Sequence, residues 1–335
     1  MKKIITPILL LTSLSAMAQE IPAPSFGFKH IVLEKNEVMQ TVAKATAAMV
    51  KKQLLMPDNK YDDVVELAYR SEKMKPSAVD QEFNKIFAEG TSFSPNYKTL
   101  ADSNFCRSEK WVNEVILSEC SGTLVSDRYL VTAGHCVTKR EEMCANYSWV
   151  FDYKLDSEGQ LPKSYTKDQV YSCKKIVKRI NSDVKVYGSH IRGDFAVIEL
   201  DRPVVGRSPV KVSQNKSVKV GTKIVNISYP LGTPAKISSV GTVSSFMNTR
   251  GIFWFNAPAF SGSSGGGIFN AETGEMVGVV AQTALNTKIK EYWNPCTEMI
   301  DLQTKADRSE KRKAHTTSGT QMRKIIRTLK KLKAI

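Results

Sequence analysis

The segment CSGTLVSDRYLVTAGHC, residues 120–136, decides the fold class of this 335-residue chain. From Thr123 to Val131 apolar and polar residues alternate, which predicts a β-strand with one buried face. A loop of small residues follows and presents the imidazole of His135. A lone histidine in a chain with only four is ordinarily structural, so the residues around His135 decide its role.

A second segment, FSGSSGGGIFN at residues 260–270, contains a candidate nucleophile, Ser264. A serine hydroxyl becomes reactive only when a base removes its proton and fixed donors stabilise the oxyanion, and glycines let the backbone bring such donors close. A flexible Gly/Ser linker is the alternative interpretation. Apolar residues continue at Ile268-Phe269 and resume at 276–280 after a Glu-Thr-Gly turn, which favours a hairpin over a linker.

A carboxylate that holds the imidazole in place is expected as the third member of the site. Asp194 is our candidate, because in the segment RGDFAVIELDRP it comes directly before the apolar strand Phe195 to Leu200. Asp183 and Asp201 are the competitors, but their positions are more typical of a loop residue and a strand-end cap.

These segments resemble the chymotrypsin-like (trypsin-like) serine peptidases, in particular secreted bacterial members. The run from Thr132 to Cys136 resembles the T-A-A/G-H-C motif of that family, and Gly262 to Gly266 resembles its G-D/N-S-G-G/S loop. The resemblance implies an all-β fold of two six-stranded antiparallel β-barrels. It also implies a catalytic triad of His135, Asp194 and Ser264, and no cofactor.

The same resemblance implies further features of the site. The backbone N–H groups of Gly262 and Ser264 are expected to form the oxyanion hole, and Cys120 and Cys136 are expected to be bonded. Closing a loop of that length stabilises a fold by about 3 kcal/mol in the chain-entropy model. Ser263 stands where pancreatic relatives carry an aspartate that receives a new amino terminus, so we do not expect activation by that ion pair.

The residues around Ser264 also satisfy G-x-S-x-G, the nucleophile elbow of α/β-hydrolases. That fold needs the order serine, acid, histidine, whereas the order here is His135, acid, Ser264. The only histidine after Ser264 is His315, which lies in a basic tail. The chain order therefore favours a peptidase over an esterase.

Substrate preference is expected to depend on residues near the nucleophile. By resemblance, the specificity pocket is lined by Pro258, Ala259, Val280, Ala281, Gln282 and Thr283. None of these residues is acidic, and none is a histidine of the kind that glutamyl-specific relatives carry there. A neutral pocket accepts small or apolar side chains, so we do not expect cleavage after Lys, Arg or Glu.

Patterns outside the motifs set the expected domain boundaries. Residues 1–18 combine a basic start, an apolar stretch and an Ala-Met-Ala site, as in a signal peptide. Residues 19–100 show helical spacing of apolar residues and are expected to be a helical pro-region, as in a zymogen, or an accessory segment. Short strand-like runs place the peptidase domain at 101–304, with barrels at about 104–205 and 206–300.

Residues 305–335 form a basic tail that ends in an amphipathic helix. The formal net charge of the chain is +15, and the tail carries eleven Lys or Arg against two acids. We expect the helix to pack on the core. Contact of the tail with anionic surfaces is a further expectation, because a cluster of cations attracts polyanions.

Export would carry the six cysteines into an oxidising compartment, where disulfides form. Beyond the bridge named above the pairing stays open; one completion joins Cys106 to Cys296 and Cys144 to Cys173. The chain has no run of 18 apolar residues, which is the length that could span a bilayer. We expect a monomeric serine endopeptidase in the periplasm or outside the cell, acting on proteins or peptides. The alternative is an inactive homologue that binds anionic envelope or host molecules.

Overall fold

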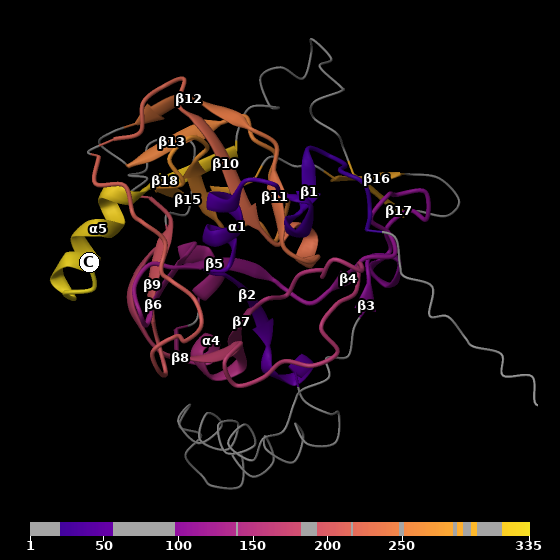
Figure 1. The fold of residues 1–335 in the computed structure, drawn as a ribbon, viewed down its shortest axis with the longest axis horizontal. Coiled ribbons are helices and arrows are strands. Elements are labelled where there is room, and N and C mark those ends of the chain that lie inside the picture. The colour runs from indigo at the N-terminus through magenta and orange to yellow at the C-terminus, as the bar shows by residue number, and fades with distance from the viewer. Residues whose placement is uncertain are drawn as a thin grey trace, which may run out of the picture.

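The computed structural model consists mainly of β-strands, which form two barrels stacked one above the other in Figure 1. It describes residues 21–55, 98–138, 140–181, 193–215, 217–247, 251–283, 287–290, 296–299 and 317–335. The expected signal peptide lies outside these residues.

The first barrel is a closed ring of six strands in the order β2-β5-β6-β9-β8-β7, and every neighbouring pair is antiparallel. Its strands are β2 (Thr46–Lys51), β5 (Cys120–Leu124), β6 (Tyr129–Thr132), β7 (Tyr147–Phe151), β8 (Val170–Ile180) and β9 (Phe195–Leu200). All six residues of β9 are buried, because its inner face fills the barrel and helix α5 (Met322–Lys331) contacts it. This double burial explains the continuous apolar run that follows Asp194.

The second barrel closes through a pairing between β10 and β14, in which Val225 lies opposite Phe269. The ring runs β10-β12-β13-β18-β15-β14 and returns to β10, with antiparallel pairs throughout. Its strands are β10 (Lys223–Ser228), β12 (Gly241–Met247), β13 (Ile252–Phe255), β14 (Gly267–Asn270), β15 (Met276–Gln282) and β18 (Thr317–Gln321), and β11 (Lys236–Ser238) also pairs with β10. The expected fold class, two six-stranded antiparallel barrels, is confirmed.

Two barrel strands lie outside the boundaries expected from the sequence. Strand β2 falls within 19–100, and β18 falls within 305–335. The first five residues of β2 are all buried, so it lacks the alternation that marks a half-exposed strand. Ala48 and Met49 also continue the three- and four-residue spacing of Val42 and Ala45, which fits a helix. Strand β18 reads TSGTQ and has no apolar residue, because its place comes from backbone pairing with β13 and β15.

The N-terminal segment is partly helical, as expected. Helix α1 (Glu37–Ala43) begins after Asn36, whose side chain accepts hydrogen bonds from the N–H groups of Val38 and Met39. This is a standard N-cap. Before it, strand β1 (Phe28–His30) pairs with β11 of the second barrel. The helical pattern expected near residues 64–68 lies outside the described residues.

Three disulfides join segments that are distant in the sequence. The expected Cys120–Cys136 bridge is present, and Cys106–Cys296 and Cys144–Cys173 complete the pairing. The remaining elements are β3 (Lys98–Thr99), β4 (Val115–Ile116), β16 (Thr287–Lys290), β17 (Cys296–Met299), α4 (Arg140–Asn146) and short 3₁₀ turns at Ile31–Leu33, Lys52–Leu55, Ala101–Ser103, Gly134–Val137 and Pro230–Gly232. In the described parts of the chain, no helix has the length and apolar character needed to cross a membrane.

Helix α5 packs on the barrels by its apolar face, as expected. Met322, Ile325, Ile326 and Leu329 are buried in the main hydrophobic core. The opposite face carries exposed cations, such as Arg327 and Lys330. Helix α5 is therefore part of the folded domain.

We predict that Leu329→Ala lowers the free energy of unfolding by about 2–5 kcal/mol, because a large buried side chain is removed and a cavity remains. Leu329 is fully buried, whereas Arg327 on the same helix is exposed. Arg327→Ala is the matched control and should change stability by less than about 0.5 kcal/mol. Urea unfolding of both variants measures the difference, and equal stabilities would contradict a structural role for α5.

Candidate active site

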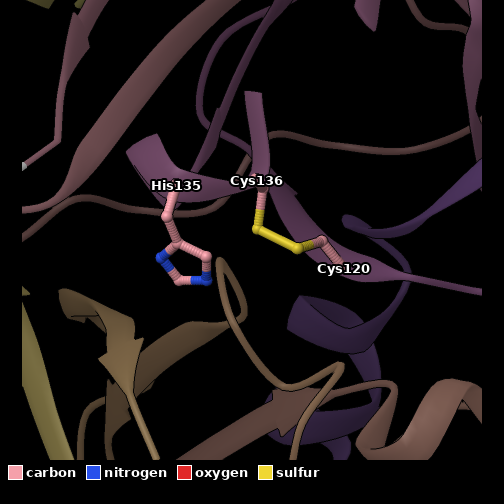
Figure 2. A group of neighbouring side chains, drawn as sticks. All are labelled: Cys120, His135 and Cys136. Atoms are coloured by element: carbon pink, nitrogen blue, oxygen red, sulfur yellow. A yellow bond between two sulfur atoms is a disulfide. The ribbon is translucent and has the colours of Figure 1, made fainter. Parts of the chain in front are cut away.

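His135 lies on a short 3₁₀ turn, Gly134–Val137, that follows β6. Figure 2 shows its imidazole beside the Cys120–Cys136 disulfide, which ties this turn to the start of β5. The carbonyl oxygen of Gly134 accepts a hydrogen bond of 2.8 Å from Nε of Arg179 on β8. The turn is thus anchored on both sides, and the imidazole has a defined position.

Asp194 holds His135 at two points. Its Oδ1 accepts from the backbone N–H of His135 at 2.9 Å, and its Oδ2 lies 2.6 Å from Nδ1 of the ring. The Asp194 side chain is 12% exposed and the His135 side chain 38%. The carboxylate is therefore largely shielded, while the imidazole remains open to a substrate. A hydrogen bond to Nδ1–H leaves Nε2 as the basic nitrogen.

Thr320 of β18 fixes the backbone of Asp194 from the other barrel. Its hydroxyl donates to the Asp194 carbonyl oxygen and accepts from the Asp194 N–H, both at 2.9 Å. Sequence reasoning missed this residue, because Thr320 is 126 positions away in a segment with no strand pattern. No local signal could have identified it.

The two competing carboxylates do not occupy this position. Asp201 accepts a hydrogen bond from the backbone N–H of Ser172 and pairs with Arg202 at 2.7 Å, so it joins strand ends as expected. Asp183 lies outside the described residues.

Ser264 lies in a loop between β13 and β14 that packs against the first barrel. Its carbonyl oxygen accepts from the N–H of Ser121 at 2.8 Å and is 3.8 Å from Sγ of Cys136, the neighbour of His135. The next residue, Gly265, has φ +85°, and a Cβ there would lie 2.1 Å from Ser121 O and from Thr132 Oγ1. Only glycine fits, and this close approach brings Ser264 to the strands that carry His135.

Two backbone donors of this loop lie at the positions expected for the oxyanion hole. In the described part of the chain, the N–H groups of Gly262 and Ser264 donate to no protein acceptor, whereas those of Ser263, Gly265 and Gly266 all do. Gly262 has φ +85°, and a Cβ there would lie 2.5 Å from Tyr229 O. Both N–H groups thus remain available to a ligand oxygen.

The sulfur atoms of Cys120 and Cys136 and a ring nitrogen of His135 lie within 4.8 Å of one another. Such a cluster could in principle hold a soft metal ion, because thiolate and imidazole are zinc ligands. The two cysteines are bonded to each other, however, so neither offers a thiolate (Figure 2). The oxidised pair serves as a brace beside the imidazole.

Comparison with known proteins agrees with this geometry. Residues 120–279 match the family described as trypsin-like peptidase domain. This part of the chain therefore resembles a trypsin-like peptidase domain. A search of curated proteins gave no match.

Among solved structures, one similar protein is neuropsin, a serine protease expressed in the limbic system of mouse brain, at 17% identity and a TM-score of 0.43. That alignment covers 64% of this chain and 89% of neuropsin. Another is a Glu endopeptidase at 20% identity and a TM-score of 0.39, with 64% and 86% of the two chains covered.

Within the nucleophile loop, the side chain of Ser263 is completely buried. Ser263 Oγ accepts from Phe260 N–H and lies 3.1 Å from Ser228 Oγ, which lies 2.9 Å from Asn226 Oδ1. Asn226 Nδ2 in turn donates to Pro258 O at 2.7 Å. The side chains of Ser263, Ser228 and Asn226 carry no charge, so they offer no partner for a protonated amino terminus.

The expected pocket residues of the peptidase domain have different environments. Ala259 and Val280 belong to the apolar core of the second barrel, and Ala281 is also buried. Pro258 and Thr283 are half-buried, and Gln282 is exposed. The specificity pocket thus remains a prediction, and Pro258, Gln282 and Thr283 are its accessible members.

We predict that Asp194→Asn lowers the rate of acylation by a serine-directed reagent about 10⁴-fold, as the matching change does in a well-studied serine protease. The amide keeps the side-chain volume but holds the wrong tautomer of His135. Asp201→Asn is the matched control and should leave the rate within about twofold, a difference below 0.5 kcal/mol. Equal effects in the two variants would show that Asp194 does not act on His135.

Proposed function

We propose that this chain is a serine endopeptidase that hydrolyses peptide bonds through an acyl-enzyme. The observation that carries the proposal is the pairing of Asp194 with His135 beside the Ser264 loop, where two N–H groups are available. Acyl transfer requires three parts. They are a base that a buried carboxylate orients, a serine nearby, and backbone donors that are available to the oxyanion.

The first half of the reaction forms the acyl-enzyme. Nε2 of His135 takes the proton of Ser264 as Oγ attacks the substrate carbonyl carbon, and the carbonyl π-electrons move to oxygen. The N–H groups of Gly262 and Ser264 stabilise this oxyanion. His135 then protonates the leaving amine as the C–N bond breaks. Water repeats the sequence on the ester and releases the acid. Asp194 stabilises the imidazolium at both stages.

For the substrate we propose small or apolar side chains at the cleavage site. The accessible members of the expected pocket, Pro258, Gln282 and Thr283, carry no charge that would pair with Lys, Arg or Glu. A peptide library measures this preference, and dominant cleavage after a charged residue would contradict it.

We further propose export, with residues 1–18 removed as a signal peptide. The three disulfides support an oxidising compartment, either the periplasm or the cell exterior. We propose that the enzyme acts as a monomer.

We predict that a fluorophosphonate adds one covalent group to the wild-type protein, on Ser264, and none to Ser264→Ala. The reagent requires an activated serine and donors for its oxygen, so the adduct reports an assembled site. Intact mass measures the adduct, and unfolding of both proteins checks that the fold is the same. A folded wild-type protein that forms no adduct would favour the alternative, an inactive homologue.

A second candidate function is the binding of polyanions by α5. Arg323, Arg327 and Lys330 project from successive turns and line a cavity of about 490 Å³ with Gln214 and Asn215, and no carboxylate lines it. Like charges four residues apart destabilise a helix unless an anion compensates them. This surface suits the sulfate or phosphate groups of an anionic polymer.

We predict that Arg327→Glu with Lys330→Glu lowers the salt concentration at which the protein leaves a heparin column. The matched control reverses Lys163 and Lys167, which are exposed on the first barrel and alter net charge equally. Each lost phosphate-like contact reduces the salt dependence of binding by about one unit of slope. Equal shifts in both double variants would show that net charge alone governs the binding.

A further inference from the structure

The N-terminal arm, residues 25–30, is docked along the second barrel. Strand β1 runs beside β11 (Figure 1). Its residues Phe28, Lys29 and His30 lie opposite Ser238, Ile237 and Lys236. Two backbone hydrogen bonds of 2.9 and 2.8 Å close a tight turn from Ser25 to Phe28. The Ser239 N–H donates to Gly27 O at 2.6 Å. The chain then enters α1 and β2, so one continuous segment connects both barrels.

The turn places two aromatic rings of the arm on Phe260. The ring centroids of Phe26 and Phe28 each lie 6.1 Å from that of Phe260, and the Trp111 centroid lies 5.9 Å from it. Phe26 and Trp111 also meet edge to face at 5.4 Å. Phe260 is only 2% exposed. Its environment is therefore supplied by residues far away in the sequence, and aromatic contacts of this geometry are attractive.

Phe260 is the first residue of the nucleophile loop and positions the rest of it. Its carbonyl oxygen accepts from Ser263 N–H at 3.0 Å, and its own N–H donates to Ser263 Oγ at 3.3 Å. Ser263 lies between Gly262 and Ser264, the two residues whose N–H groups are the proposed oxyanion donors. A shift of the Phe260 ring would thus move both oxyanion donors.

A buried group of charged side chains fixes where the arm docks. Glu114 Oε1 lies 3.1 Å from His30 Nε2, and Glu114 Oε2 accepts from Lys236 Nζ. Nζ of Lys236 also lies 4.6 Å from the Trp111 ring centroid. His30, Glu114 and Lys236 are 1%, 9% and 0% exposed. Slipping β1 by one residue would turn His30 away and leave the buried Oε1 of Glu114 without its hydrogen bond to the imidazole.

The charge states of this group follow from burial and contact. Burial lowers the pKa of His30, so the imidazole is neutral at pH 7 and donates one N–H to Glu114. Burial alone would raise the pKa of Glu114, but Lys236 and His30 hold it below its ordinary value. The carboxylate is therefore ionised and pairs with Lys236.

We propose that the N-terminal arm is a permanent part of the enzyme, and that Phe26 and Phe28 act through Phe260 as positioning residues for the oxyanion donors. This inference rests on the proposed peptidase function. The support is apolar packing, because Ser263 within the loop carries no charge. Within the expected segment 19–100, at least the arm and β2 remain in the active molecule.

The test is Phe26→Ala in the full exported chain, with Phe26→Leu as the conservative variant and Phe246→Ala as the matched control. Phe246 is 40% exposed on β12 of the same barrel, while Phe26 is half-buried, so each variant should fold. Hydrogen exchange of the peptide 259–266 reports the loop without requiring activity. The rate of fluorophosphonate labelling at Ser264 and the separate values of kcat and KM report its function.

For Phe26→Ala we expect exchange in 259–266 about tenfold faster and labelling by the fluorophosphonate about tenfold slower, with KM within about twofold. Phe26→Leu should restore most of the labelling rate, and Phe246→Ala should match wild type. A variant that loses stability but keeps loop protection and labelling would overturn the inference. So would a labelled enzyme whose first residue lies after His30. Wild-type protein that is never labelled would instead contradict the peptidase function, and the exchange data would still decide the role of the arm.

Discussion

The site depends on the close contact between the nucleophile loop of the second barrel and strands β5 and β6 of the first. Ser121 donates to the Ser264 carbonyl oxygen, and Gly265 approaches so closely that no side chain fits. His135 lies three residues beyond the end of β6. The contact therefore sets the distance between serine and imidazole, because neither barrel alone carries both.

Several elements hold that contact in place from different directions. The Cys120–Cys136 disulfide braces the imidazole, and Thr320 crosses from β18 to hold Asp194. The uncharged hydrogen bonds that link Ser263, Ser228 and Asn226 support the loop without an ion pair. A loop supported by packing and neutral hydrogen bonds is preorganised as folded, which suits electrostatic catalysis.

Part of this arrangement could be predicted before the fold was known. The segments around His135, Asp194 and Ser264 carry their residue patterns locally, so motif and chain order alone predict their roles. The pairing of Cys120 with Cys136 followed from the family resemblance. The pattern over β2 predicts a helix, because a fully buried strand shows no alternation. Ala259 and Val280, expected in the pocket, lie in the apolar core of the second barrel. The pocket stays a prediction, since a position close to the nucleophile along the chain does not specify which way a side chain points.

The sequence by itself therefore determined which side chains could perform the chemistry and the class of fold that would present them. Only the tertiary structure decided which strands complete the barrels, what holds Asp194, and where the N-terminal arm docks. The physical reason is that motifs depend on residues adjacent in the chain. Pairings between distant segments close the second barrel through β18, place Thr320 on Asp194 and bury Phe260. The periodicity of the sequence does not indicate which distant segments pair.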